Sequence, residues 1–229
     1  MKAHYPRMRD GAPPGLVPKF GGLPWGLPQR LWPVCKECGG LLSHLAQLPH
    51  DADTMPVGEG HVLFVFKCES DKVCSFWEHD GGANALLSVP ASELGDAPTS
   101  PPTADTAPAL LREVGIVGWD TSDDGCPPEL ESAFYGFSSY DDLPDEIAQP
   151  HDFASEWRTK SGGVPAWTGN GAQAQPDIPP GRLLFQVDNW LALDDGGTAQ
   201  IANFCSDGTA YVFVDRAVVP PAFTMFINR

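Results

Sequence analysis

Short apolar runs, separated by polar stretches rich in glycine and proline, dominate the hydrophobic pattern of this chain. The clearest run, over residues 61–67, holds five consecutive β-branched, aliphatic and aromatic side chains, which is typical of a fully buried strand. Weaker patterns predict strands over 41–48, 85–89 and 110–119. Asp152 is a candidate N-cap for one short helix over 153–159. The pattern therefore predicts a mainly β protein of the α+β type, with few short helices.

Changes in composition suggest where the chain divides. Residues 1–18 are rich in proline and glycine, and we expect them to lie extended on the surface. From residue 90 to 108 the chain turns to proline, alanine, threonine, serine and aspartate, as linkers do, and acidic turns follow. We expect a first β unit over 1–89, a linker and acidic insertion over 90–150, and a second β unit over 151–229. A single compact domain is the alternative.

The two expected β units share motifs in the same order. The matching segments are 21–25 (Gly-Gly-Leu-Pro-Trp) with 162–167 (Gly-Gly-Val-Pro-Ala-Trp), 43–48 with 183–187 around a glutamine, and 64–66 with 211–214. Three matches in one order indicate an internal duplication. We therefore expect two pseudo-symmetric halves packed together, with a zinc knuckle in the first half.

Cysteine spacing provides the strongest chemical signal in the sequence. Cys35 and Cys38 are separated by two residues and followed by glycines; after 29 further residues comes Cys68 and, after another five, Cys74. Four thiolates suit a closed tetrahedral zinc site, which leaves no position for a substrate and so has a structural role. We expect one structural zinc ion per chain. Two alternatives are replacement of one thiolate by a histidine (His44, His61 or His79) and four ordinary thiols.

Charge and composition restrict the partners that this chain can bind. The sequence has 30 acidic and 14 basic residues, a formal net charge of −16, and glycine and proline at 24 each. Such a field repels nucleic acid and anionic lipid, and it attracts a basic protein or peptide. Acidity that only maintains solubility is the alternative. The N-terminal stretch lacks the apolar core of a signal peptide, and no run approaches the roughly 20 apolar residues of a membrane span, so we expect a cytoplasmic protein.

Few residues are candidates for catalysis or binding beyond the cysteines. Cys205 lies in an acidic turn, which disfavours the thiolate that a nucleophile needs, and Cys126 has no neighbouring cysteine. Turns explain Asp194-Asp195-Gly-Gly better than a calcium loop, because no full twelve-residue loop follows. We expect no catalytic residue. Exposed aromatic and acidic side chains are candidates for binding a partner. These candidates are Trp25, Trp167, Asp141, Asp142, Asp194 and Asp195. For the two tryptophans, packing in the core is the alternative role.

The motifs resemble those of known families over most of the chain, outside roughly residues 85–150. Gly-Gly-Leu-Pro-Trp at 21–25, the Cys-x2-Cys-Gly turn, Leu-Ala-Gln-Leu at 45–48 and the strand ending at Cys68 resemble the YwqG-like family of bacterial proteins. The motifs at 162–165, 184–187 and 207–213 resemble its C-terminal half, although Cys205 replaces an expected glycine. This resemblance implies a duplicated β-rich fold and names no activity.

The first half is also similar to the programmed cell death protein 2 family, whose cysteines are placed like those at 35, 38, 68 and 74. That family implies a chaperone for a basic ribosomal protein, but this chain lacks the family's additional metal-binding region. We therefore expect a non-enzymatic, chaperone-like binding protein for a basic polypeptide. The alternatives are an immunity protein that neutralises a cationic toxin, and a thiol or hydrolytic enzyme that uses Cys205 and the acidic loops.

Overall fold

The computed structural model describes residues 1–70, 72, 74–105, 107–155, 159–168, 181–205 and 207–228, without the side chains of 137 and 138. Within them, ten strands form one antiparallel sheet: β1 (Lys2–Asp10), β2 (Lys19–Phe20), β3 (Ser43–Pro49), β4 (His61–Lys67), β5 (Asn84–Pro90), β6 (Val114–Asp123), β7 (Lys160–Gly162), β8 (Arg182–Asp188), β11 (Thr209–Asp215) and β12 (Ala222–Asn228). A separate hairpin and several short helices complete the fold: β9 (Trp190–Ala192), β10 (Thr198–Gln200), α1 (Glu131–Phe134), α2 (Phe137–Asp141), α3 (Asp145–Ala154), η1 (Gln29–Leu31), η2 (Ala91–Glu93) and η3 (Pro128–Leu130). The prediction of a mainly β protein with few short helices is confirmed.

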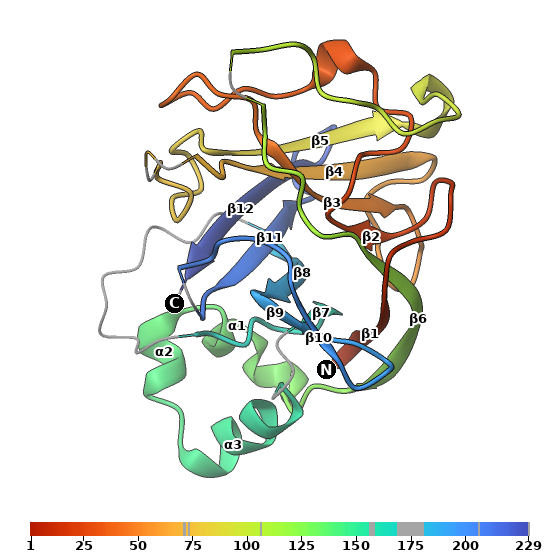
Figure 1. Cartoon of the computed structure of the whole chain (residues 1–229). Coiled ribbons are helices and arrows are strands. Elements are labelled where there is room, and N and C mark those ends of the chain that lie inside the picture. Colours follow the sequence, from red (N-terminus) through yellow and green to blue (C-terminus); the bar gives the residue numbers. More distant parts are fainter. Residues whose placement is uncertain are drawn as a thin grey trace.

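The sheet has the order β12-β11-β8-β7-β1-β6-β2-β3-β4-β5, with β1 and β6 at its centre (Figure 1). The sheet curls until its two outer strands meet. The side-chain amide of Asn84 on β5 donates to the Met225 carbonyl on β12 at 3.4 Å. The result is a nearly closed barrel, and the three α-helices lie together at the end away from β3–β5 (Figure 1). Closure of this kind protects the sheet edges.

One apolar core serves both halves of the chain. Phe64 and Leu48 from the first half belong to the same buried cluster as Phe185 and Val212 from the second half. All four side chains are at most 2% exposed. Because burial of apolar surface is the main favourable term in folding, we expect the halves to stabilise each other.

The two halves of the sheet correspond strand by strand. In the first half β2 pairs with β3, with Lys19 opposite Gln47; in the second half β7 pairs with β8, with Lys160 opposite Gln186. The strand order read outward from the centre also matches, with β2, β3, β4 and β5 on one side and β7, β8, β11 and β12 on the other. This geometry agrees with the repeated motifs, while duplication of an ancestral unit stays a prediction.

Local apolar patterns located β3, β4 and β5 well, and the strand expected over 110–119 overlaps β6, but three other expectations differ from the structure. Residues 2–10 are extended as expected, but they form the central strand β1, in which Ala3 and Met8 are buried, rather than a segment that only covers the surface. Pro6 can occupy this strand because β1 pairs with β7 only near its start, at Ala3 and His4. Within the expected linker and insertion, β6 is a central strand of the sheet.

The helix expected after Asp152 lies elsewhere. Helix α3 covers Asp145–Ala154, so Asp152 is in its last turn rather than at its N-cap. Pro144 precedes the helix, and Asp145 and Glu146 occupy its first turn, where carboxylates interact favourably with the helix dipole. Residues 156–158 of the expected helix lie outside the described residues.

Candidate metal centre

Four cysteines from separate segments meet in the first half of the molecule. The Sγ atoms of Cys35, Cys38, Cys68 and Cys74 all lie within 4.8 Å of one another, and those of Cys38 and Cys68 are 3.8 Å apart. A tetrahedral ion with sulfur ligands at about 2.3 Å requires sulfur atoms roughly 3.8 Å apart. The spacing predicted that these residues gather, and the structure confirms it.

The first cysteine pair lies in a tight turn closed by backbone hydrogen bonds. The N–H of Cys35 donates to the Gly40 carbonyl at 2.8 Å, and the N–H of Gly39 donates to the Cys35 carbonyl at 3.0 Å. Gly39 adopts a φ of +75°, which a glycine accepts at little cost. The N–H of Gly40 lies 3.4 Å from Cys38 Sγ, where it can stabilise a thiolate. We call residues 35–40 the cysteine turn.

The second pair is supplied by the end of β4 and the loop that follows it. The N–H of Cys68 donates to the Ala83 carbonyl at 2.8 Å, which fixes this cysteine directly after the end of β4. This loop is also bound to the cysteine turn, because the N–H of Lys36 donates to the Gly82 carbonyl at 3.0 Å and Ser75 N–H donates to the Glu37 carboxylate at 2.8 Å. Hydrogen bonds between the cysteine turn and this loop therefore hold the two cysteine pairs near each other.

Burial makes this cluster unfavourable for thiolates unless a cation is present. Cys35, Cys68 and Cys74 are buried, whereas Cys38 is half-buried. Burial raises the pKa of the Cys68 thiol to about 11 and also raises the pKa of Cys74. The Gly40 N–H instead lowers the pKa of Cys38 to about 7. A bound divalent cation would offset the cost of three buried thiolates, so the donor set fits a metal ion.

The structure also decides between the ligand sets that the sequence left open. Among the described residues, this cluster contains the four cysteines and no histidine. His44 instead directs Nδ1 toward the carbonyls of Gly21 and Gly22, at 3.1 Å from each, and His61 Nδ1 lies 2.9 Å from the Glu59 carbonyl. A set of four cysteines is therefore the arrangement that the geometry supports.

The two remaining cysteines are outside the cluster. Cys126 is buried near the helices, and burial raises the pKa of its thiol to about 11. Cys205 is half-buried with a φ of +57°. Burial lowers the pKa of Lys67, while the nearby Glu69, and after it Cys68 and Cys205, act in the opposite direction. The Lys67 amine is already engaged, since it pairs with Glu69 at 2.7 Å.

The candidate binding residues lie on separate elements. Trp25 and Trp167 are half-buried; the Trp167 indole N–H donates to the Phe134 carbonyl at 2.8 Å, and its ring centroid is 4.9 Å from that of Tyr211. The four acidic candidates are exposed, two at the end of α2 and two in the β9–β10 turn: Asp141, Asp142, Asp194 and Asp195. A role of any of these six residues in binding stays a prediction.

Sequence reasoning missed a groove that lies beside the β9–β10 hairpin. Its volume is about 630 Å³, and Trp190, 53% exposed, lies on its wall. Residues from β1, β6, β8 and the β9–β10 hairpin line it, including Tyr5, Arg7, Asp120, Asp188, Trp190 and Asp194. The signal that could have located it is the isolated Trp190 among aspartates, but only the fold brings Asp120 to the same place.

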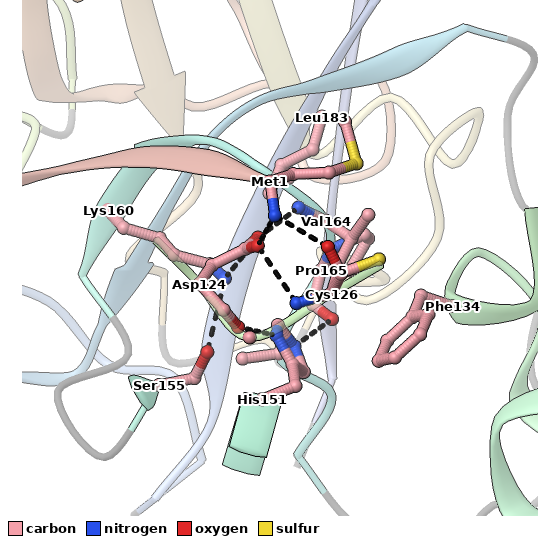
Figure 2. A network of polar contacts seen from close by, with 12 residues as sticks. Met1, Asp124, Cys126, Phe134, His151, Ser155, Lys160, Val164, Pro165 and Leu183 are labelled. Atoms are coloured by element: carbon pink, nitrogen blue, oxygen red, sulfur yellow. Dashed lines mark hydrogen bonds and ion pairs between the residues drawn. The ribbon is translucent and has the colours of Figure 1, made fainter. Parts of the chain in front are cut away.

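A buried polar network, which the sequence did not predict, is centred on Asp124 and Lys160 (Figure 2). The Lys160 amine is 3.6 Å from Asp124 Oδ2 and donates to Ser155 Oγ at 3.1 Å, while Asp124 also accepts the Val164 N–H at 2.8 Å. His151 places a ring nitrogen 2.6 Å from the Asp124 carbonyl. Burial lowers the pKa of Lys160, and the Asp124 charge opposes that shift.

The first half contains a similar pair, which favours a structural role for this network. There, Lys19 pairs with Glu113 at 2.6 Å. Lys19 and Lys160 each lie two positions before the first glycine of a Gly-Gly turn. In both halves the lysine and a carboxylate therefore support the same type of turn.

Comparisons of this chain with protein-family models, with curated proteins and with solved structures find no match. The resemblance to the YwqG-like and programmed cell death protein 2 families therefore stays a prediction. Within the described residues, no helix has the length and apolar character required to cross a bilayer.

Proposed function

We propose that this protein is a non-enzymatic, chaperone-like binding protein that holds a basic polypeptide in the cytoplasm, and that its four-cysteine cluster binds one structural zinc ion. The observation that carries the binding proposal is the groove beside Trp190, which combines an exposed indole with several carboxylates on a chain of net charge −16.

The zinc proposal rests on the donor set and its burial. Four sulfur donors select a soft or borderline ion, and zinc accepts a tetrahedral sulfur site without redox chemistry. None of the six cysteines, all of which the structure describes, forms a disulfide, as is usual in a reducing compartment. A closed site of this kind joins the cysteine turn to the loop after β4, so its role is to stabilise the fold.

The groove suits an arginine or lysine side chain of the partner. Asp120, Asp188 and Asp194 line it together with one cation, Arg7. The Arg7–Asp120 pair is 3.8 Å long, and both side chains are more than half exposed. Because exposed pairs of this length contribute little free energy, a partner's cation can replace Arg7 at low cost.

Trp190 adds a second mode of recognition for the same cation. A guanidinium or ammonium group gains free energy over an indole face, and this contribution grows when the pair is shielded from water. The remaining negative field of the protein increases the rate at which a basic partner arrives, and salt weakens this effect. The groove therefore predicts binding that depends on both an aromatic ring and ionic strength.

The test measures binding of a fluorescent arginine-rich peptide to the full chain at about 20 and 300 mM salt. We expect measurable binding at low salt, at least a tenfold loss at high salt, and a similar loss for Trp190→Ala and for the double variant Asp120→Asn/Asp194→Asn. Glu93→Gln/Asp96→Asn is the matched control, since it removes the same charge at exposed positions outside the groove lining.

Two outcomes would contradict the proposal. Absence of binding at low salt would reject a basic partner. Equal losses for the groove and control variants would show that net charge alone attracts the peptide. Metal analysis of protein purified without added zinc tests the other part, and about one zinc ion per chain is the expected result.

A further inference from the structure

A polar pocket opens beside the cysteine cluster and exposes one of its sulfur atoms. The pocket has a volume of about 440 Å³, and its walls include Cys38, Cys68, Ser43 and Lys72. Cys38 is half-buried, whereas the other three cysteines are at most 3% exposed. A small solute can therefore reach the cluster from one side, and the thiol it meets first belongs to Cys38.

We propose that Cys38 is an oxidation site, at which a small peroxide entering this pocket converts the Cys38–Cys68 pair to a disulfide. This inference rests in part on the proposed metal site, because formation of the disulfide would release the metal. The observations that carry it are the accessible sulfur, the pocket beside it, and the distance of 3.8 Å between the two Sγ atoms.

The chemistry requires only the peroxide as oxidant. The Cys38 thiolate attacks one peroxide oxygen, the O–O bond breaks, and with hydrogen peroxide the departing hydroxide takes a proton from solvent to form water. The Cys68 thiolate then attacks the Cys38 sulfur of the sulfenic acid; an S–S bond forms, the S–O bond breaks, and a second water leaves after protonation. The two sulfurs lose two electrons, and the peroxide gains them.

The backbone around the cysteines indicates which one moves. The two sulfurs must approach from 3.8 Å to the roughly 2.05 Å of a disulfide. Cys68 is fixed at the end of β4 by its N–H bond to the Ala83 carbonyl, whereas Cys38 lies in the cysteine turn beside Gly39 and Gly40. The turn can adjust more easily than the sheet, so Cys38 would move toward Cys68.

Disulfide formation removes two of four ligands and so converts a closed site into an incomplete one. Cys35 and Cys74 alone cannot complete a tetrahedral sulfur site, and the affinity for the ion falls accordingly.

The experiment treats the full-length protein with hydrogen peroxide, follows released zinc with a coloured chelator, and locates disulfides by peptide mass spectrometry. We expect release of about one equivalent of zinc in step with a Cys38–Cys68 disulfide. Cys38→His should retain zinc, because imidazole is also a ligand, and should release it at least tenfold more slowly. The double variant Cys126→Ser/Cys205→Ser should behave as the wild type.

A pocket variant tests access separately from ligand chemistry. Ala109 lines the pocket, and Ala109→Trp should slow the reaction several-fold while zinc content stays unchanged. Ala104→Trp, in the same segment but outside the pocket lining, is the matched control. Retention of zinc in excess peroxide, or a first disulfide that omits Cys38, would overturn the inference. If the purified protein held no metal, the zinc proposal would fail, and disulfide mapping alone would still decide whether Cys38 is the oxidised residue.

Discussion

Gln47 accepts a hydrogen bond from the backbone N–H of Trp25 at 2.6 Å, and its side-chain amide donates to the Val17 carbonyl at 2.8 Å. The second half repeats the first of these bonds, since Gln186 accepts from the backbone N–H of Ala166 at 2.9 Å. Both glutamines are fully buried. In each half one strand glutamine therefore holds the segment that follows the Gly-Gly turn.

Replacement of these glutamines should be costly despite the gain in apolar character. Gln47→Leu leaves a buried N–H and a carbonyl without their side-chain partner, and we expect a loss of roughly 2–4 kcal/mol in the free energy of unfolding. Gln186→Leu should lose about 1–3 kcal/mol. Urea unfolding measures both. Gln149→Leu, at an exposed position of α3, is the control and should change stability by less than about 0.5 kcal/mol. Equal effects at all three positions would contradict this role.

The second glycine of each Gly-Gly turn lies against a carboxylate. An added Cβ at Gly22 would lie 2.2 Å from Glu113 Oε2, and at Gly163 it would lie 2.1 Å from Asp124 Oδ2, with φ of +63° and +65°. Gly11 has a φ of +74° and open space. We expect Gly11→Ala to cost about 1–2 kcal/mol from its backbone alone, and the other two alanine variants to cost at least about 1 kcal/mol more. Thermal unfolding checks this order, and equal costs would show that the contact with the carboxylate has no effect.

The parts of the fold that the sequence predicted are those with a local signal. The run over residues 61–67 is apolar throughout because β4 is buried on both faces between β3 and β5, and its boundaries were correct. The four-cysteine cluster was also predictable, because each cysteine pair lies within one turn or loop. A central strand with polar residues and a proline, such as β1, has no such pattern.

The missed features depend on contacts between distant segments. β1 and β6 pair over residues separated by more than 100 positions, for instance Lys2 with Asp123, and no local period signals that pairing. The groove beside Trp190 has the same origin, since Asp120 reaches it only through this pairing. Local patterns thus predicted strands and ligands, while the centre of the sheet and the groove required the full topology.

The two lysine–carboxylate pairs should differ in their importance for stability. Lys160 and Asp124 have fully buried side chains, whereas Glu113, the partner of Lys19, is 32% exposed. Lys160→Met removes one of two cations that face the buried Asp124 carboxylate and leaves the Met1 ammonium at 2.9 Å, so we expect a loss of about 2–4 kcal/mol. Lys19→Met should cost less, roughly 1–2 kcal/mol, because Glu113 can turn toward solvent. Equilibrium unfolding of the two variants tests this, and a larger loss for Lys19→Met would contradict the explanation.

His44 should make the stability of this protein depend on pH. Burial lowers the pKa of His44 to about 4, and its Nδ1–H donates to the carbonyls of Gly21 and Gly22. The unfolded chain binds a proton near pH 6.5, while the folded chain does so only near pH 4. The contribution of neutral His44 is therefore complete above pH 6.5 and is lost as pH falls toward 4, by roughly 3 kcal/mol.

The variant His44→Leu tests this dependence, because leucine occupies the matching position, Leu183, in the second half. The variant loses two hydrogen bonds near neutral pH, so we expect its stability at pH 7.5 to lie at or below that of the wild type. Between pH 7.5 and 4.5 the wild type should lose about 2–3 kcal/mol more than the variant, because only the wild type must keep a buried imidazole neutral. Urea unfolding at several pH values gives the free energy of unfolding of both proteins. The contribution of other titrating groups cancels in the difference between them. Parallel curves over this range would show that His44 takes up its proton equally in both states and would reject the explanation.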